Sequence, residues 1–208
     1  MRKALLLTAL AVLAACKAEK VEISLDSGMI VAAADGVASE VSFEATLGEQ
    51  YSTVDDEKRA QIESVKSLIE KYFPGVEVNV DIGSDEYRIE VDGSLAVSKA
   101  SPSSGAPWHV SATRATEGEG IVVQLLPAAS FGSFKAELQE VNMILGADEY
   151  QPVEFNFTAP SGIVLVGGAI VDGFPTGIAR IPMNGQTIRM LFKEGVWENT
   201  SGTFLYIP

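Results

Sequence analysis

The chain has 208 residues, of which 47% are hydrophobic and 21% are charged, with 28 acidic residues against 15 basic ones. This composition is ordinary for a globular protein, and the length suits one large domain or two small ones. The net charge of −13 excludes a nucleic-acid binder, because neutralising phosphates needs clustered Lys and Arg. One histidine and one cysteine exclude two-His metal motifs, a thiolate zinc cage and an intramolecular disulfide.

Residues 1–15 have the organisation of a secretion signal. Arg2 and Lys3 form a positive start, and an apolar run follows from Ala4 to Ala15. About a dozen residues cover only ~18 Å as a helix, which is too short to span ~30 Å of hydrocarbon. No later stretch reaches about 18 uninterrupted apolar residues, so we expect no membrane-crossing helix in the body.

The end of this signal, Leu13-Ala14-Ala15-Cys16, resembles the lipobox of bacterial lipoproteins. The resemblance implies that Cys16 receives a diacylglycerol, that a peptidase cuts between Ala15 and Cys16, and that the new amine is acylated in Gram-negative bacteria. Lys17 stands where an Asp signals inner-membrane retention in enterobacteria. The resemblance therefore implies an outer-membrane protein that faces the periplasm. It covers the signal alone, and the body resembles no named family.

An acylated Cys16 has a direct physical consequence. One acyl chain binds a bilayer only marginally, whereas two or more anchor a protein stably. We therefore expect membrane lipid as a partner, with residues 16–20 as the tether. Cleavage leaves 13 basic and 28 acidic residues, a net charge of −15, so the body gains nothing from an anionic leaflet and is expected to stand off it.

Residues 21–98 predict a β-β-α-β-β unit. Alternating apolar residues predict strands at 21–25, 41–47, 76–82 and 87–91. A helix capped at Thr53 carries an apolar stripe and stops at Pro74-Gly75. We expect this helix to lie on a small antiparallel sheet.

Residues 99–107 contain no large apolar side chain and predict a linker between two domains. Residues 108–208 predict a β-rich, sandwich-like half, with strands at 121–126, 153–157, 163–171, around Trp197 and at 204–207. Gly167-Gly168 suggests a bulge or bend, and residues 133–145 fit either a helix or a strand. The predicted fold class is therefore α+β.

Candidate catalytic groups are few. His109 is the single possible imidazole base, and neither G-x-S-x-G nor S-x-x-K occurs. Beside Trp108, His109 is better explained as a packing residue. No phosphate-binding glycine loop is present. We predict no catalytic residue, no cofactor and no enzymatic activity.

One stretch partly fits a calcium loop. Asn79, Asp81, Gly83 and Glu90 occupy the first, third, fifth and twelfth places of the template, but Ser84 replaces its required glycine. The flanks also have the alternation of strands. We favour a solvated sheet face ending in a hairpin, and predict no metal site.

The Asn184-Gly185 pair predicts a two-residue hairpin turn. That turn would set Arg180 directly opposite Arg189, and opposed like charges are unfavourable. The ordinary explanation is a nearby carboxylate or solvation. The alternative is a contact point for an anionic partner such as lipid A phosphate or an acidic protein surface.

These patterns predict a lipid-anchored binding or assembly protein on the periplasmic face of the outer membrane, with an envelope protein as partner. Two alternatives stay open. One is a carrier of a small molecule or ion, with a pocket between the two halves, which a buried apolar cavity with a few polar groups would favour. The other is a phage-type lipoprotein that masks a surface receptor.

Overall fold

The computed structural model describes residues 19–50, 53–116, 118–141, 151–193 and 202–208. The first six elements, in chain order, are β1 (Lys20–Asp26), α1 (Ser27–Ala34), β2 (Ser39–Gln50), α2 (Asp56–Tyr72), β3 (Glu77–Ile82) and β4 (Glu86–Ser98). The next four are β5 (Trp108–Arg114), β6 (Ile121–Pro127), α3 (Phe131–Val141) and β7 (Val153–Thr158). The last four are β8 (Ile163–Val171), β9 (Phe174–Pro182), β10 (Thr187–Phe192) and β11 (Phe204–Ile207).

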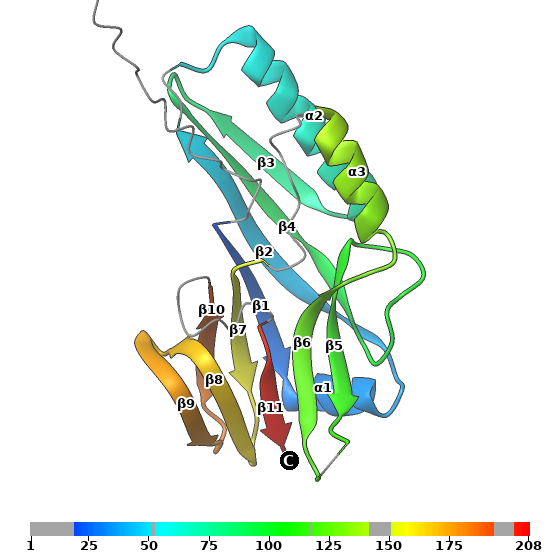
Figure 1. The fold of residues 1–208 in the computed structure, drawn as a ribbon, viewed down its shortest axis with the longest axis vertical. Helices are drawn as coiled ribbons and strands as arrows, with labels where there is room; N and C mark the ends of the chain where they lie inside the picture. The colour runs from blue at the N-terminus through cyan, green and yellow to red at the C-terminus, as the bar shows by residue number, and fades with distance from the viewer. Residues whose placement is uncertain (1–18, 51–52, 117, 142–150, 194–201) are drawn as a thin grey trace, which may run out of the picture.

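Nine of the strands close into a barrel (Figure 1). Their order is β10, β7, β1, β2, β4, β5, β6, β11 and β8, and β8 pairs with β10 to complete the ring. The pairs β1–β7 and β4–β5 are parallel, while the other pairs are antiparallel. Strand β3 joins the sheet beside β4, and β9 joins it beside β8. Within the described residues, no helix is long and apolar enough to span a bilayer.

The predicted α+β fold, with a small antiparallel sheet followed by a sandwich-like half, is wrong. The protein is 50% strand and 21% helix, and one closed barrel uses strands from both halves of the chain. Residues 99–107 do form an irregular connection, but β4 before it pairs with β5 after it. Local alternation identifies a strand without naming its partner, and the pairing of β1 with β7 joins segments more than a hundred residues apart.

Aromatic side chains fill the barrel interior near its closing strands. The ring of Phe204 lies 5.5 Å from Phe155 and 5.3 Å from Phe157, and the ring of Tyr206 lies 5.2 Å from Phe157. Each of these side chains alternates along its strand with a more exposed neighbour, as a sheet with one buried face requires.

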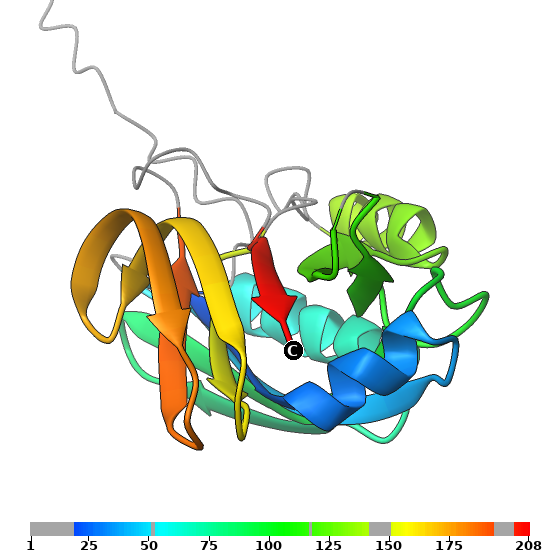
Figure 2. The same cartoon turned by 90° about the horizontal axis from the view of Figure 1, so that it is seen from below.

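Helix α1 lies across one end of the barrel (Figure 2). Asp26 caps it by accepting a 3.0 Å hydrogen bond from the backbone N–H of Met29, and Ile30 and Ala33 are fully buried. The sequence did not predict this helix, because its eight residues are apolar or small on every side and show no amphipathic period.

Strands β2 and β4 are the longest in the sheet and pair along their whole length. Beside them, β3 pairs with β4, and α2 packs against β3 and α3 (Figure 1). Helix α2 begins after Asp55, whose carboxylate accepts a 2.9 Å hydrogen bond from the N–H of Lys58, so the predicted cap at Thr53 is wrong by two residues. The predicted stop at Pro74-Gly75 is confirmed.

The ambiguous segment 133–145 is helical as far as Val141, within α3. Its remainder, like the strand predicted around Trp197, lies outside the described residues. Helix α3 runs alongside α2, so the two helices together cover the same part of the sheet (Figure 1).

Candidate functional site

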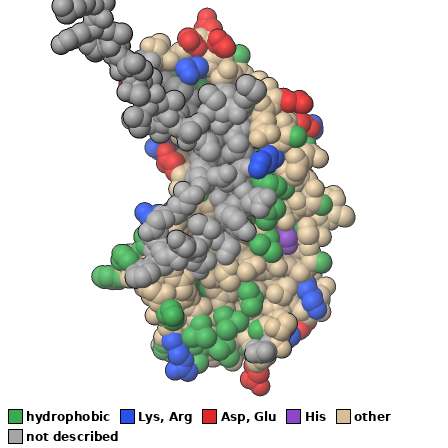
Figure 3. Space-filling model, viewed as in Figure 1, with side chains coloured by type: hydrophobic (Ala, Val, Ile, Leu, Met, Phe, Trp, Pro, Cys, Tyr) green, Lys and Arg blue, Asp and Glu red, His purple; other side chains and the backbone are tan. Residues whose placement is uncertain are grey.

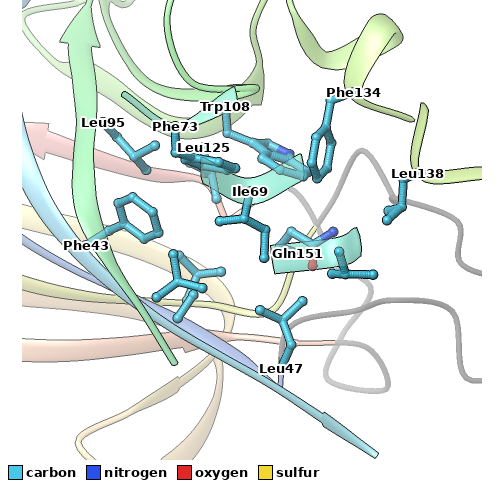
Figure 4. A pocket seen from close by; sticks show the side chains of 14 residues that line it. Phe43, Leu47, Ile69, Phe73, Leu95, Trp108, Leu125, Phe134, Leu138 and Gln151 are labelled. Atoms are coloured by element: carbon cyan, nitrogen blue, oxygen red, sulfur yellow. The ribbon is translucent and has the colours of Figure 1, made fainter. Parts of the chain in front are cut away.

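An apolar cavity of about 80 Å³ lies between these two helices and the sheet (Figure 4). Val65 and Ile69 of α2 and Phe134 and Leu138 of α3 line it from the helical side. Each pair is spaced four residues apart, so both members point from the same face of their helix. The cavity therefore forms where two amphipathic helices meet the sheet.

The sheet supplies the opposite side of the cavity. Phe43 and Ala45 of β2, Leu95 of β4, Trp108 of β5 and Leu125 of β6 all line it. These side chains come from both sides of the 99–107 connection. Side chains from both halves of the chain thus surround one space.

Aromatic rings form one wall of the cavity (Figure 4). The ring of Trp108 stacks on Phe73 at 6.3 Å and meets Phe134 edge-on at 5.8 Å. Phe134 also meets Tyr72 edge-on at 5.3 Å. Such contacts fix large side chains in place and stabilise the pair beyond its buried area.

Gln151 is the one polar side chain among the described residues that line the cavity, and it is 7% exposed. Its amide already interacts with another group of the protein, and the rest of the described lining is apolar. Sequence reasoning missed Gln151, because a single glutamine before a strand carries no pattern. The other residues that line the cavity were also missed, since the sequence does not distinguish them from core residues.

A polar contact on the outside joins the two helices over this cavity. Lys71 and Tyr72 of α2 both donate hydrogen bonds to the carboxylate of Glu137 on α3. The hydrogen bond between Lys71 and Glu137 is the main cause that lowers the pKa of Glu137. The same hydrogen bond is the main cause that raises the pKa of Lys71. Burial, followed by the Glu137 contact, raises the pKa of the Tyr72 hydroxyl.

The cavity suits binding better than catalysis. Within the described lining, no side chain can donate or accept a proton at neutral pH, so general acid–base chemistry has no group there. A pocket for a drug-sized molecule needs ~300 Å³ or more. The present space accommodates only a small apolar group.

His109 lies on β5 next to Trp108 but does not line the cavity. Its side chain is 2% exposed, and Nδ1 finds no hydrogen-bond partner among the described residues. Burial lowers the pKa of His109, while a hydrogen bond with the backbone of Leu126 acts in the opposite direction. A neutral, packed imidazole matches the packing role expected from the sequence.

The partial calcium template folds as the predicted hairpin between β3 and β4. Asn79 lies opposite Glu90, and Asp81 lies opposite Arg88, so Asp81 is paired across the strands with a cationic residue. Across the described part of the chain, no group of three or more potential ligands is placed to hold a metal ion.

The predicted opposition of Arg180 and Arg189 is wrong. The chain does turn at Asn184-Gly185, with Gly185 at φ +95°, but β9 pairs with β8 while β10 pairs with β7 and β8. Arg180 therefore lies opposite Leu165, and Arg189 lies opposite Asn156. The chain bends at the predicted pair, but the predicted hairpin between β9 and β10 does not form, because strand pairing depends on competing partners that local sequence does not reveal.

The carboxylate expected near this arginine pair lies beside Arg189 alone. Glu22 accepts hydrogen bonds from Lys20 and from the Asn156 amide, the latter at 2.8 Å. Lys20 is the main cause that lowers the pKa of Glu22, and the charge of Arg189 acts in the same direction. Arg180 is exposed and has no ion pair within the described residues.

Ala15, Cys16 and Lys17, the residues of the predicted lipobox and sorting position, lie outside the described residues. No protein-family model, curated protein or solved structure matches the chain significantly. The functional interpretation of the cavity therefore rests on the geometry of the cavity alone.

Proposed function

We propose that this protein is a lipid-anchored carrier that holds a small apolar molecule, or the apolar end of a larger one, between α2, α3 and the sheet. The cavity lined by Val65, Phe134 and Gln151 carries this proposal. It matches the carrier alternative predicted from the sequence, which required an apolar pocket with few polar groups between the two halves. The anchor at Cys16 belongs to the same proposal and is supported by the lipobox.

The energetics of an empty cavity support a binding role. Protein interiors contain few voids larger than a water molecule. At ~24 cal/mol per Å³, leaving about 80 Å³ of apolar space unfilled costs at most about 2 kcal/mol of stability. Replacing Ala45 by a larger residue would recover part of this free energy. A protein that retains a destabilising cavity is expected to use that cavity for function. Binding of an apolar ligand is the simplest such use.

Xenon binding tests the cavity directly, because xenon enters apolar voids without needing polar contacts. We expect the parent protein to bind xenon, detected by chemical-shift changes of methyl groups that line the cavity. Ala45→Leu fills the void, so it should abolish these changes while maintaining or raising the melting temperature. Retained cavity-specific shifts in Ala45→Leu would contradict the proposal.

A pair of matched variants separates the cavity from general packing. Leu138→Ala enlarges the void and should admit benzene as well as xenon. Leu25→Ala removes the same atoms from a residue that is 3% exposed but does not line the cavity. Each substitution should cost about 2–5 kcal/mol of stability. If both variants acquire benzene binding equally, the binding does not belong to this cavity.

A further inference from the structure

Three adjacent strands form a wall with almost no charge. The outer wall, defined as β8, β9 and β11, contains a single charged residue, Arg180. The whole chain carries a net charge of −13, so a surface with one cation and no acid is unlike the rest of the molecule. The acid that follows β8, Asp172, accepts a hydrogen bond from the backbone N–H of Arg189 at 3.0 Å.

Two large apolar side chains project from this outer wall. Along β9, Ala179 and Ile181 pack against the core, whereas Phe174 is 75% exposed and Ile178 is 89% exposed. Among the described residues, the one other large hydrophobic side chain with such exposure is Val37. Figure 3 shows hydrophobic side chains gathered where β8, β9 and β11 lie, with basic side chains beside them.

Partly exposed apolar residues extend this surface across the strands. Leu165 of β8 lies between Arg180 of β9 and Leu205 of β11, and Leu205 lies opposite Val122 of β6. All three apolar side chains are only partly buried. The outer wall is therefore a continuous apolar surface with one cation. Surfaces of this kind mark contact sites for proteins or membranes.

The free edge of β9 is poorly suited to pairing with another strand. Pro175 and Pro182, near its two ends, lack the backbone N–H that a new strand would need. Prolines on an edge strand protect a sheet against strand addition. Contact through the face of the outer wall is therefore favoured over β-strand pairing with a second copy.

We propose that the outer wall rests on the anionic bilayer surface that holds the acyl anchor, with Phe174 and Ile178 entering the headgroup layer and Arg180 meeting lipid phosphate. This inference rests on the proposed anchor at Cys16. Lys20 is four residue steps from Cys16, so β1 begins within about 14 Å of the residue that carries the lipid. Salt screens the repulsion between the bilayer and acidic residues that lie more than ~8 Å from it. Acidic residues on other faces of the protein therefore do not prevent the outer wall from contacting the anionic bilayer. The body then docks instead of standing off.

Site-specific labelling of the full lipoprotein tests this docking. Acylation converts the sulfur of Cys16 into a thioether, so a cysteine introduced at Ile178 becomes the single reactive thiol. The mature protein, labelled with a bimane dye, is reconstituted into phosphatidylcholine vesicles with or without phosphatidylglycerol. Lipids that carry a shallow nitroxide should quench Ile178→Cys strongly, and Val37→Cys, the exposed apolar control, weakly.

The contribution of the Arg180 charge to docking is tested with Arg180→Gln in the Ile178→Cys background. One cation near an anionic surface contributes about fivefold to the ratio of docked to undocked protein, so quenching should fall in phosphatidylglycerol vesicles and change little in phosphatidylcholine alone. Equal quenching at positions 178 and 37 overturns the docking. Energy transfer between labelled copies that grows with protein density overturns it in favour of self-association.

The anchor and the docking fail in distinguishable ways. A parent protein without an introduced cysteine should take no dye. If its Cys16 does react, the lipid anchor is disproved and the docking inference falls with it. If Cys16 is unreactive and Ile178 stays unquenched, the anchor stands and the docking alone is overturned.

Discussion

The ammonium of Lys71 on α2 lies 2.5 Å from the carboxylate of Glu137 on α3, and the Tyr72 hydroxyl donates a 2.8 Å hydrogen bond to the same carboxylate. These contacts join the two helices that cover the cavity. Because Lys71 is exposed and Glu137 is partly exposed, their attraction is screened by salt. The contact is therefore suited to hold together reversibly the two helices that line the cavity.

Glu137→Gln should loosen α3 from α2, because the amide keeps the shape of the carboxylate and loses its charge. We expect faster hydrogen exchange across residues 131–141 and faster xenon exchange, with the fold retained. Hydrogen-exchange mass spectrometry at neutral pH measures the first effect. Glu70→Gln is the matched control, since the Lys66–Glu70 pair at 3.8 Å lies within α2 alone. Equal acceleration by both variants would show that Glu137 does not join the helices.

Several elements of this fold could be predicted from the sequence, because their signals are local. Strict alternation identified β1, β3 and β7, a short apolar run identified β11, and an apolar stripe identified α2. Helix α1 escaped detection because Ser27–Ala34 has no polar face. The closed barrel could not be predicted, because the pairing of Ile23 with Phe155 and of Val97 with Val110 depends on competition among all the strands.

The candidate site was predictable only in part. The carrier alternative anticipated an apolar pocket between the halves, but no pattern distinguishes Val65 or Leu138 from ordinary core residues. The hairpin between β8 and β9 was also missed. It turns at Asp172-Gly173, a sequence pair that favours such turns as strongly as Asn184-Gly185. The Asp172-Gly173 pair is therefore the local signal in the sequence for the pairing of β8 with β9.

Gly173→Ala should destabilise the hairpin that carries the outer wall. Gly173 has φ +90°, in the left-handed region where an alanine costs about 1–2 kcal/mol. Urea denaturation measures the loss in the free energy of unfolding. Gly132→Ala in α3 is the matched control, since a Cβ there meets no atom within 4 Å and the backbone is helical. That change should raise stability by about 0.5–1 kcal/mol. Equal losses in the free energy of unfolding for Gly173→Ala and Gly132→Ala would show that the positive φ of Gly173 is not the cause of the destabilisation.

His109 should make the fold less stable as the pH falls. Burial holds its pKa below the ordinary value of 6.5, so between these two values the unfolded chain binds a proton that the folded protein does not. Its contribution is therefore fully favourable above 6.5 and declines as the pH drops toward the lowered pKa. His109→Gln should remove this component, which is at most about 1.4 kcal/mol for each pH unit between the folded and unfolded pKa values. The measurement is the free energy of unfolding of both proteins at about pH 7.5 and about pH 5.5. Parallel pH profiles would show that His109 is not the source.

Cys16→Ser should leave residues 1–15 attached, because a serine hydroxyl cannot replace the thiol that receives diacylglycerol. The precursor should accumulate at a higher mass and incorporate no alkyne-labelled fatty acid, whereas the parent protein incorporates it. Mass spectrometry of the purified protein and gel fluorescence measure these two effects. A peptide inhibitor of the lipoprotein signal peptidase should likewise block cleavage of the parent protein. Normal maturation and envelope association of Cys16→Ser would remove the basis of the proposed anchor.

Lys17→Asp tests the sorting step separately from acylation. In an enterobacterial host, this variant should be acylated and cleaved like the parent protein but remain in the inner membrane, because the residue after the lipidated cysteine determines release there. Sucrose-gradient separation of the two membranes measures the change in location, and unchanged fatty-acid labelling is its internal control. Because Lys17 precedes β1, the substitution should leave the xenon binding of the cavity intact. An unchanged outer-membrane location would show that position 17 does not direct sorting.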